Sequence, residues 1–319
     1  LPSVKALALV SKMSPKDQIA LTIGNGYQGP LQIQLDGAAG YTTGSLMKNL
    51  HLPNIVMADG PAGLRVVNQV KEKLKDGREQ VTSFYATEWP TATVLAQSWN
   101  TDMVTKIGEA IGQEMMEFGV TLWLAPGMNI QRNPLCGRNF EYFSEDPLVS
   151  GIMAVSLTNG VQKHPGLGTT LKHFACNNQE DNRNHASSNL SERALREIYL
   201  RGFELAVRLA QPKAIMSSYN LINGVYAPNN EELLVDILRH EWGFSGLVMT
   251  DWWSCAKDRG NPALCVPSGN DLIMPGSKDD QKAVEKAFRK KKIAADDLKL
   301  SAARVVDVLL TNPFIKIPE

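Results

Sequence analysis

Short apolar runs recur along this 319-residue chain, and longer stretches with helical periodicity separate them. Gly, Pro or Asn flanks each run, and continuous apolar runs of this kind are typical of strands buried on both faces of a parallel sheet. This alternation predicts an α/β fold, and the number of strands is close to that of a TIM-type (β/α)8 barrel with an irregular first βα unit. The expected strands are residues 54–60, 91–99, 120–130, 169–178, 213–220, 246–253 and 271–276.

Apolar side chains at three- and four-residue spacing predict helices between the strands. The clearest are residues 101–118, 191–210 and about 296–311, each opened by residues suited to a helix start. The segment 67–88 lies between the first two expected strands and is rich in Lys and Glu. It predicts an exposed loop or insertion, and it is a candidate lid.

The charge balance excludes two classes of partner. Lys and Arg together number 33, Asp and Glu also number 33, and the sequence pI is about 7.1. A chain without net charge has no overall field to attract nucleic acid or an anionic membrane surface. No apolar run approaches the roughly 20 residues of a membrane-spanning helix. We therefore expect neither nucleic acid nor a membrane as a partner.

The cysteines indicate neither a disulfide framework nor a zinc site. Cys136, Cys176, Cys255 and Cys265 are few and lack paired CxxC spacing. We interpret them as reduced thiols, with a Cys255–Cys265 disulfide as the alternative. Unpaired cysteines and the lack of a recognisable leader favour a cytoplasmic location.

Polar or ionisable residues end five of the apolar runs at their carboxyl side. They are Asp59, Asn129, Lys172 with His173, Tyr219 with Asn220, and Asp251. Polar residues mark strand ends in many proteins, but barrels also place their chemistry at the face where the strands end. Five such ends in one chain favour a functional face.

Absent motifs narrow the chemistry. The sequence has no GxSxG elbow, GxxxxGK[ST] loop or HExxH, and no GxGxxG after an expected strand, which removes specific support for serine hydrolases, nucleotide binding and zincins. Carboxylates, Arg, Lys, His and aromatic residues remain. Charged groups can hold vicinal hydroxyls and aromatic rings can cover sugar C–H groups, so this inventory suits carbohydrate chemistry without a metal or an organic cofactor.

The tetrapeptide TDWW at 250–253 is the sharpest local feature. Asp251 follows the apolar GLVM run and precedes two tryptophans. A carboxylate in this place can attack an anomeric carbon, and an adjacent indole can form the wall of a sugar pocket. The alternative is that Asp251 caps the next helix beneath core tryptophans.

Five further segments join TDWW in an ordered set that covers nearly the whole chain. They are MADGPAGLR (57–65), NPLCGRNFEYFSEDP (133–147), LKHFACNNQEDNR (171–183), IMSSYNLINGVYAPNN (215–230) and GNDLIMPG (269–276). Together these motifs resemble glycoside hydrolase family 3, most closely its β-glucosidases.

The resemblance implies a role for each matching residue. Asp251 would be the catalytic nucleophile, with Trp252 packed beside the sugar. Asp59 would hold the hydroxyls farthest from the scissile bond, and Tyr219 would lie by the nucleophile. The other implied sugar-binding residues are Arg65, Arg138, Lys172, His173 and Met216.

Two of these residues have structural alternatives. The less favoured alternative for Arg138 is an ion pair with Glu141 or Glu145 in its own loop. The less favoured alternative for His173 is a core histidine whose hydrogen bonds are satisfied.

A retaining glycosidase needs a second carboxyl group to protonate the leaving oxygen. In two-domain members of the family, that acid/base Glu comes from an α/β sandwich domain, which nothing in this chain resembles. We therefore expect one barrel domain over residues 1–319, with the sandwich domain or chain as its partner. Glu180, Asp181 and His185 are less favoured substitutes.

The resemblance implies a retaining exo-β-glucosidase that acts on small β-glucosides or cello-oligosaccharides through a glycosyl-Asp251 intermediate. A β-xylosidase is the nearest enzymatic alternative, because one hydroxymethyl group is a small difference to read from sequence. The alternative from another class is a sugar-binding barrel fragment with little turnover.

Overall fold

The structure is a computed structural model of the chain. It describes residues 1–26, 39–42, 52, 54–66, 69–74, 76–83 and 85–314. Within the described ranges, no helix has both the length and the apolar character needed to cross a membrane.

A six-stranded sheet forms the centre of the fold, in the order β1-β2-β5-β6-β8-β11. Pairs from β2 to β11 are all parallel, as the buried apolar runs predicted, whereas β1 pairs antiparallel with β2. The strands are β1 (Gly40–Tyr41), β2 (Val56–Ala58), β5 (Leu122–Trp123), β6 (Gly168–Phe174), β8 (Ala214–Ser217) and β11 (Leu247–Thr250).

Beyond β11 the sheet continues only as single bridges. Leu272, in the expected strand 271–276, forms a parallel bridge to Met249, and Ile273 forms another to Ile23. The amide of Asn25 then donates to the carbonyl of Tyr41 in β1 over 2.9 Å. The described residues therefore form a mixed six-stranded sheet whose two edges are linked by isolated bridges and not by two further strands.

The expected strand 91–99 is wrong, because α4 (Ala92–Gln97) occupies this segment. Its β-branched residues favoured a strand. However, Ala92, Leu95 and Ala96 are buried while Val94 is exposed, which is the spacing of one helix face and not the alternation of a strand.

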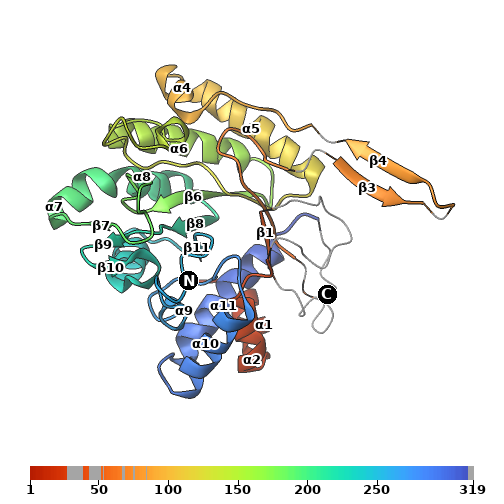
Figure 1. Ribbon diagram of the computed structural model, residues 1–319, viewed down its shortest axis with the longest axis vertical. Helices are drawn as coiled ribbons and strands as arrows, with labels where there is room; N and C mark the ends of the chain where they lie inside the picture. The colour runs from red at the N-terminus through yellow and green to blue at the C-terminus, as the bar shows by residue number, and fades with distance from the viewer. Residues whose placement is uncertain are drawn as a thin grey trace.

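Helices cover both faces of the sheet. Figure 1 shows α4, α5 and α6 grouped on one side, with α1, α2, α10 and α11 grouped on another. Expected helices 101–118 and 296–311 are present as α5 and α11, whereas 191–210 is divided into α7, a π-helix and α8. The bounds are α1 Val4–Ser11, α2 Pro15–Leu21, α5 Thr101–Phe118, α6 Pro147–Val161, α7 Glu192–Ala194, the π-helix Leu195–Tyr199, α8 Arg201–Ala210, a second π-helix Glu232–Glu241, α9 Pro262–Cys265, α10 Lys278–Arg289 and α11 Ala295–Leu310.

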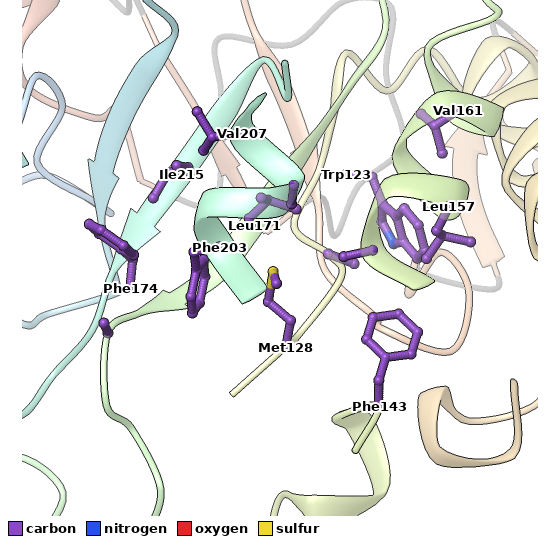
Figure 2. Close-up of a cluster of buried hydrophobic side chains, with 14 of the residues drawn as sticks. Trp123, Met128, Phe143, Leu157, Val161, Leu171, Phe174, Phe203, Val207 and Ile215 are labelled. Carbon is purple, nitrogen blue, oxygen red and sulfur yellow. The ribbon is translucent and has the colours of Figure 1, made fainter. Parts of the chain in front are cut away.

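Side chains of alternate strand residues pack into two separate apolar cores. In β8, Ile215 joins the core beneath α5, α6 and α8, while Ala214 and Met216 join the other core, which includes α11. Figure 2 shows part of the first core, where side chains of α6 and α8 such as Leu157 and Phe203 face β6 and β8. Because successive strand residues point to opposite faces, a sheet covered on both sides requires apolar residues at every position.

Segment 67–88 contains a two-stranded hairpin that the sequence did not predict, formed by β3 (Gln69–Lys73) and β4 (Glu79–Ser83). It projects away from the helices at the right of Figure 1. Its described side chains are exposed, as expected of an insertion. Residues 67, 68, 75 and 84 of this segment lie outside the described residues.

A three-stranded sheet and two short 3-10 helices complete the fold. Its strands are β7 (Ser187–Ser188), β9 (Leu221–Ile222) and β10 (Val225–Tyr226), and the 3-10 helices are Asn139–Glu141 and Ala227–Asn229. Cys255 and Cys265 are both free thiols, as interpreted from the sequence. Their sulfur atoms lie 3.3 Å apart without the alternative disulfide.

Candidate active site

A cavity of about 630 Å³ opens where the parallel strands end. All nine site residues expected from the sequence line it together: Asp59, Arg65, Arg138, Lys172, His173, Met216, Tyr219, Asp251 and Trp252. Residues from five separate segments meet here because parallel strands bring their carboxyl ends to one face. We call this the Asp251 cavity.

Asp251 directly follows β11 and is almost fully buried, with 7% of its surface exposed. One carboxylate oxygen accepts from the Trp252 amide over 2.6 Å, and the Tyr219 hydroxyl is a further hydrogen-bond partner. Burial raises the pKa of Asp251, while Arg138 and Lys172 oppose this rise by attracting its negative charge. The carboxylate is thus positioned by the Trp252 amide and the Tyr219 hydroxyl, lines the cavity and is largely shielded from water, as suits a nucleophile.

His173 lies against this carboxylate, with its Nε2 3.6 Å from an oxygen of Asp251. Burial lowers the pKa of His173 well below its usual range, and Arg138 and Lys172 lower it further. The ring is therefore neutral at neutral pH. Tyr142 and Asn129 both contact its Nδ1, at 3.3 and 3.4 Å, so this nitrogen has the partners of a core histidine, while the ring also lines the cavity.

A shift in strand register explains how two consecutive residues of β6 reach one cavity. Successive strand residues normally point to opposite faces. The pairing of β6 with β8 is irregular between Leu171 and Phe174, and Lys172 and His173 lie in that interval. An irregularity of this kind redirects side chains, and both residues line the Asp251 cavity.

Asp59 is the second carboxylate of the cavity and is bound by two cations. Lys172 donates to it over 2.7 Å, and Arg65 forms an ion pair with its other oxygen. Burial alone would raise the pKa of Asp59, but the attraction and hydrogen bond of Lys172, with smaller help from Gly60 and Arg65, hold it well below its usual range. Asp59 is therefore ionised and suited to accept hydrogen bonds from hydroxyl groups.

The turn after Asp59 requires glycine. Gly60 has φ of +111°, and a Cβ built there would lie 2.1 Å from the carbonyl oxygen of Gly63. This turn brings Arg65 back to Asp59, since the Arg65 amide donates to the Asp59 carbonyl over 2.8 Å. The DGPAGLR motif thus encodes a compact loop that presents a carboxylate and its guanidinium partner together.

Trp252 forms one wall of the cavity. Its indole Nε1 donates to the carbonyl of Ala39 over 2.9 Å, and the side chain also packs in the second core. The indole is thereby fixed beside Asp251, and the alternative in which Asp251 merely caps a helix is wrong: no helix starts at this position, and the next one is α9.

Arg138 forms the ion pair with Glu141 that was its structural alternative, and it also lines the cavity. Burial disfavours the charged guanidinium, but neighbouring Tyr142, Glu141 and Asp251 raise its pKa above its usual range. The ion pair therefore positions Arg138 and does not remove it from the site.

Arg183 and Trp253 line the cavity although the sequence reasoning gave them no role. The guanidinium of Arg183 lies 4.3 Å from the centroid of the Tyr219 ring and pairs with Glu180. Both residues stand inside motifs already quoted, as the last residue of LKHFACNNQEDNR and the second Trp of TDWW. Their place inside these motifs was the sequence signal that could have identified them as lining residues.

None of the less favoured acid/base candidates lines the cavity. Glu180 is bound by Arg183 and Asn177, Asp181 is exposed, and His185 lies beside Asp258. Among the described lining residues the carboxyl groups are Asp59 and Asp251 alone. Because the lowered pKa of Asp59 makes it a poor proton donor, the described lining offers no general acid.

The described residues contain no cluster of His, Cys, Asp and Glu that could hold a metal ion. The groups that face a ligand here are carboxylates, cations, a tyrosine and indoles. Such a set recognises hydroxyl groups and flat C–H faces, which is the chemistry of a sugar ring.

The ionisation of Asp251 yields a stability prediction: Asp251→Asn should melt at a higher temperature than the wild type at neutral pH. A raised folded-state pKa adds stability below the unfolded pKa of about 3.9, and this stability is lost as pH rises through the folded value. The neutral amide avoids that loss. Calorimetry at several pH values should show that the melting temperature of Asp251→Asn exceeds that of the wild type by an amount that grows from acid to neutral pH. A variant that melts below the wild type at neutral pH contradicts the raised pKa.

Comparison with known proteins identifies the family. Residues 45–308 match the family model described as the glycosyl hydrolase family 3 N terminal domain. The chain is 41% identical over 310 residues to an exo-alpha-(1->6)-L-arabinopyranosidase of Bifidobacterium breve, covering 97% of this chain. It is 41% identical over 286 residues to thermostable beta-glucosidase B of Acetivibrio thermocellus, covering 87% of this chain.

A solved structure gives the same result. Beta-glucosidase 3B of Thermotoga neapolitana in complex with glucose is 42% identical, with a TM-score of 0.88, over 97% of this chain and 43% of that one. The chain spans 37% of the length of each of the two curated relatives. From the matching model and the shared fold, we conclude that this chain belongs to glycosyl hydrolase family 3.

Proposed function

We propose that this chain carries the nucleophile and the glucose-binding half of a retaining exo-β-glucosidase. The observation that supports this most is the presence of two carboxylates in the Asp251 cavity, where Asp251 is buried and Asp59 is kept ionised by Lys172 and Arg65. The relatives include beta-glucosidases, and one solved relative was determined with glucose.

Each carboxylate has a distinct part in the proposed reaction. Asp59, with Lys172 and Arg65, would bind the hydroxyls of a terminal glucose unit. Asp251 would attack C1 and form an ester through its carboxylate oxygen. At the same time the bond from C1 to the leaving oxygen breaks, and that oxygen takes up a proton from the general acid. Water would then attack C1, return a proton to the base and release Asp251. Two inversions at C1 give retention of configuration.

We further infer that the proton donor lies outside these 319 residues, in an α/β sandwich domain or chain. The described lining of the cavity supplies no general acid, and the curated relatives are longer than this chain. The chain itself is then one barrel domain, in which the bridged segments at Leu272–Ile273 and at Ile23 stand in for the two remaining strands of a TIM-type barrel.

An activated substrate tests this division of labour. With 2,4-dinitrophenyl β-glucoside the leaving group needs no acid, so we expect a rapid burst of about one dinitrophenolate per chain. Further dinitrophenolate should appear slowly, because hydrolysis of the glycosyl-Asp251 ester lacks its general base. Stopped-flow absorbance measures the burst. After reaction with a 2-deoxy-2-fluoroglucoside, peptide mass spectrometry should place the sugar on Asp251. Label on another side chain contradicts the proposed nucleophile, and full turnover of cellobiose contradicts the missing acid.

Two pentopyranosides are the competing substrates. β-Xylosides remain the alternative from the sequence, and the arabinopyranosidase relative favours α-L-arabinopyranosides as a second candidate. Burst rates with matched dinitrophenyl glycosides separate the three. We expect the glucoside to react fastest, and a clear preference for either pentoside would replace glucose as the substrate.

A further inference from the structure

Cys255 and Cys265 form a pair of buried thiols in the segment that follows β11, and the proposed glycosidase reaction uses neither. Their sulfur atoms lie 3.3 Å apart, within hydrogen-bonding distance. A disulfide requires a separation of about 2.05 Å, so a further approach of about 1.3 Å brings the two sulfurs to bonding distance. We call these two residues the thiol pair.

The thiol pair is distinct from the other cysteines of the chain. All four cysteines lie within residues 85–314, which the structure describes without a gap, and all four are buried free thiols. Neither Cys136 nor Cys176 has another thiol as a hydrogen-bond partner in this range. These two residues are therefore internal controls for any reagent that attacks the thiol pair.

The backbone holds both sulfurs of the thiol pair in place. Cys255 forms a bridge with Gly260, and Cys265 ends α9, a helix capped by the side chain of Asn261. The side chain of Asn229 accepts from the Asn261 amide over 2.6 Å and donates to the Asn261 carbonyl over 3.0 Å. Two reacting groups that are held close together react much faster than the same groups free in solution. The position of the thiol pair therefore favours a bond within the pair.

Cys255 is the thiol that a reagent reaches first. It lines a cavity of about 720 Å³, which the segment 274–280 also lines, whereas Cys265 is fully buried and does not line it. The hydrogen bond with Cys255, followed by burial, raises the pKa of Cys265 well above its usual range. Because the thiolate is the reactive form, Cys265 is a poor first attacker. Cys255 therefore attacks first and Cys265 second.

The cavity beside Cys255 suits a small neutral reagent. Its described ionisable groups are Lys257 and Arg259 against Asp279 and Asp280, so their formal charges cancel. A charged reagent gains no net attraction from such a lining. A small uncharged organic disulfide is therefore the class of reagent that fits this approach to the thiol pair.

We propose that the thiol pair is a modification site that forms a reversible disulfide by exchange with a small organic disulfide. In the first step, the Cys255 thiolate attacks one sulfur of the reagent, the S–S bond of the reagent breaks, and one small thiolate leaves and takes up a proton. In the second step, Cys265 loses its proton to water and attacks the Cys255 sulfur, which releases the second small thiol. Two protein thiols are oxidised, and one small disulfide is reduced to two thiols.

The proposed bond closes a loop next to the Asp251 cavity. Within this loop, Nη1 of Arg259 donates to the carbonyl of Trp253 over 3.1 Å, two residues after Asp251. The disulfide would therefore restrain a segment that is bound to one edge of the candidate active site. The proposal does not depend on the proposed function, because neither a sugar nor the Asp251 carboxylate takes part in it.

Mass spectrometry of the reduced 319-residue chain tests the proposal. The native chain is incubated with bis(2-hydroxyethyl) disulfide and desalted, and its free thiols are blocked with N-ethylmaleimide in denaturant before digestion with trypsin. Trypsin cleaves after Lys257 and Arg259, so Cys255 and Cys265 fall in separate peptides that their disulfide joins. We expect the joined peptides in most chains, an intact mass lower by two hydrogens before blocking, and full reversal by dithiothreitol.

Two variants test the parts of the thiol pair. In Cys265→Ser the second step is blocked, so the chain should keep one mercaptoethanol group on Cys255. Cys136→Ser is the matched control, because Cys136 is also a buried free thiol, and this variant should still form the joined peptides. Near-ultraviolet circular dichroism shows whether each variant is folded.

The wild type alone can overturn the proposal, so it does not depend on the folding of a variant. The proposal fails if Cys255 and Cys265 both carry maleimide after the incubation, or if Cys136 or Cys176 is oxidised at a rate within about tenfold of theirs. It also fails if the joined peptides form only in denaturant, because the native position of the pair would then contribute nothing. The burst with 2,4-dinitrophenyl β-glucoside tests the proposed function separately.

Discussion

Asp251→Asn is expected to slow dinitrophenolate release from 2,4-dinitrophenyl β-glucoside by at least about 10⁴-fold, since the amide cannot form the glycosyl ester. The substitution keeps the size of the side chain and an oxygen that can accept from the Trp252 amide. The cavity should therefore still bind glucose, which separates loss of chemistry from loss of binding. Burst amplitude and glucose affinity are the two measurements.

A second variant at this position distinguishes a nucleophile from a residue that only positions substrate. In Asp251→Ala, added azide should occupy the vacated space, restore dinitrophenolate release and give α-glucosyl azide by a single inversion. Asp236→Asn is the matched control, because Asp236 is an exposed Asp outside the cavity. β-Glucosyl azide, or a wild-type rate in Asp251→Asn, would show that another group attacks C1.

Asp59→Asn is expected to lower the rate of Asp251 glycosylation at low substrate concentration by about 10- to 150-fold. This range corresponds to the roughly 1.5 to 3 kcal/mol contributed by a hydrogen bond to a charged group, here from a sugar hydroxyl to the Asp59 carboxylate. The amide leaves the ammonium of Lys172, whose side chain is 4% exposed, without its carboxylate. The loss should appear mainly as weaker substrate binding.

The hairpin offers a matched control for Asp59. Asp76 also pairs with an arginine, Arg78, but that pair is exposed and lies outside the cavity. Water and salt screen an exposed ion pair, so Asp76→Asn should leave both glucose affinity and the melting temperature nearly unchanged. If Asp59→Asn behaves like Asp76→Asn, Asp59 does not bind the sugar.

Much of the site could be predicted from the sequence because several of its residues end apolar runs, whereas Arg65 and Arg138 were implied by the family resemblance alone. Asp59 and Asp251 are examples, since each directly follows a strand whose apolar character alone indicates burial. The carboxyl ends of parallel strands share one face, so placing the strands also places these side chains together.

Other features depended on contacts that the chain order does not show. Ala92–Gln97 is a helix because Leu95 and its neighbours are buried against the first core, which outweighs the strand preference of Thr93 and Val94. The β3–β4 hairpin was missed because its charged strands carry no apolar alternation.

The sequence alone determined the family, most of the parallel strands and, through the family resemblance, nine of the residues that line the Asp251 cavity, because local motifs and apolar runs carry this information. Only the tertiary structure decided the opposite pKa shifts of Asp59 and Asp251, since each shift depends on burial and on charges contributed by distant segments. The tertiary structure alone also showed that Arg183 and Trp253 line the Asp251 cavity, because the walls of this cavity come together only when the strands have paired.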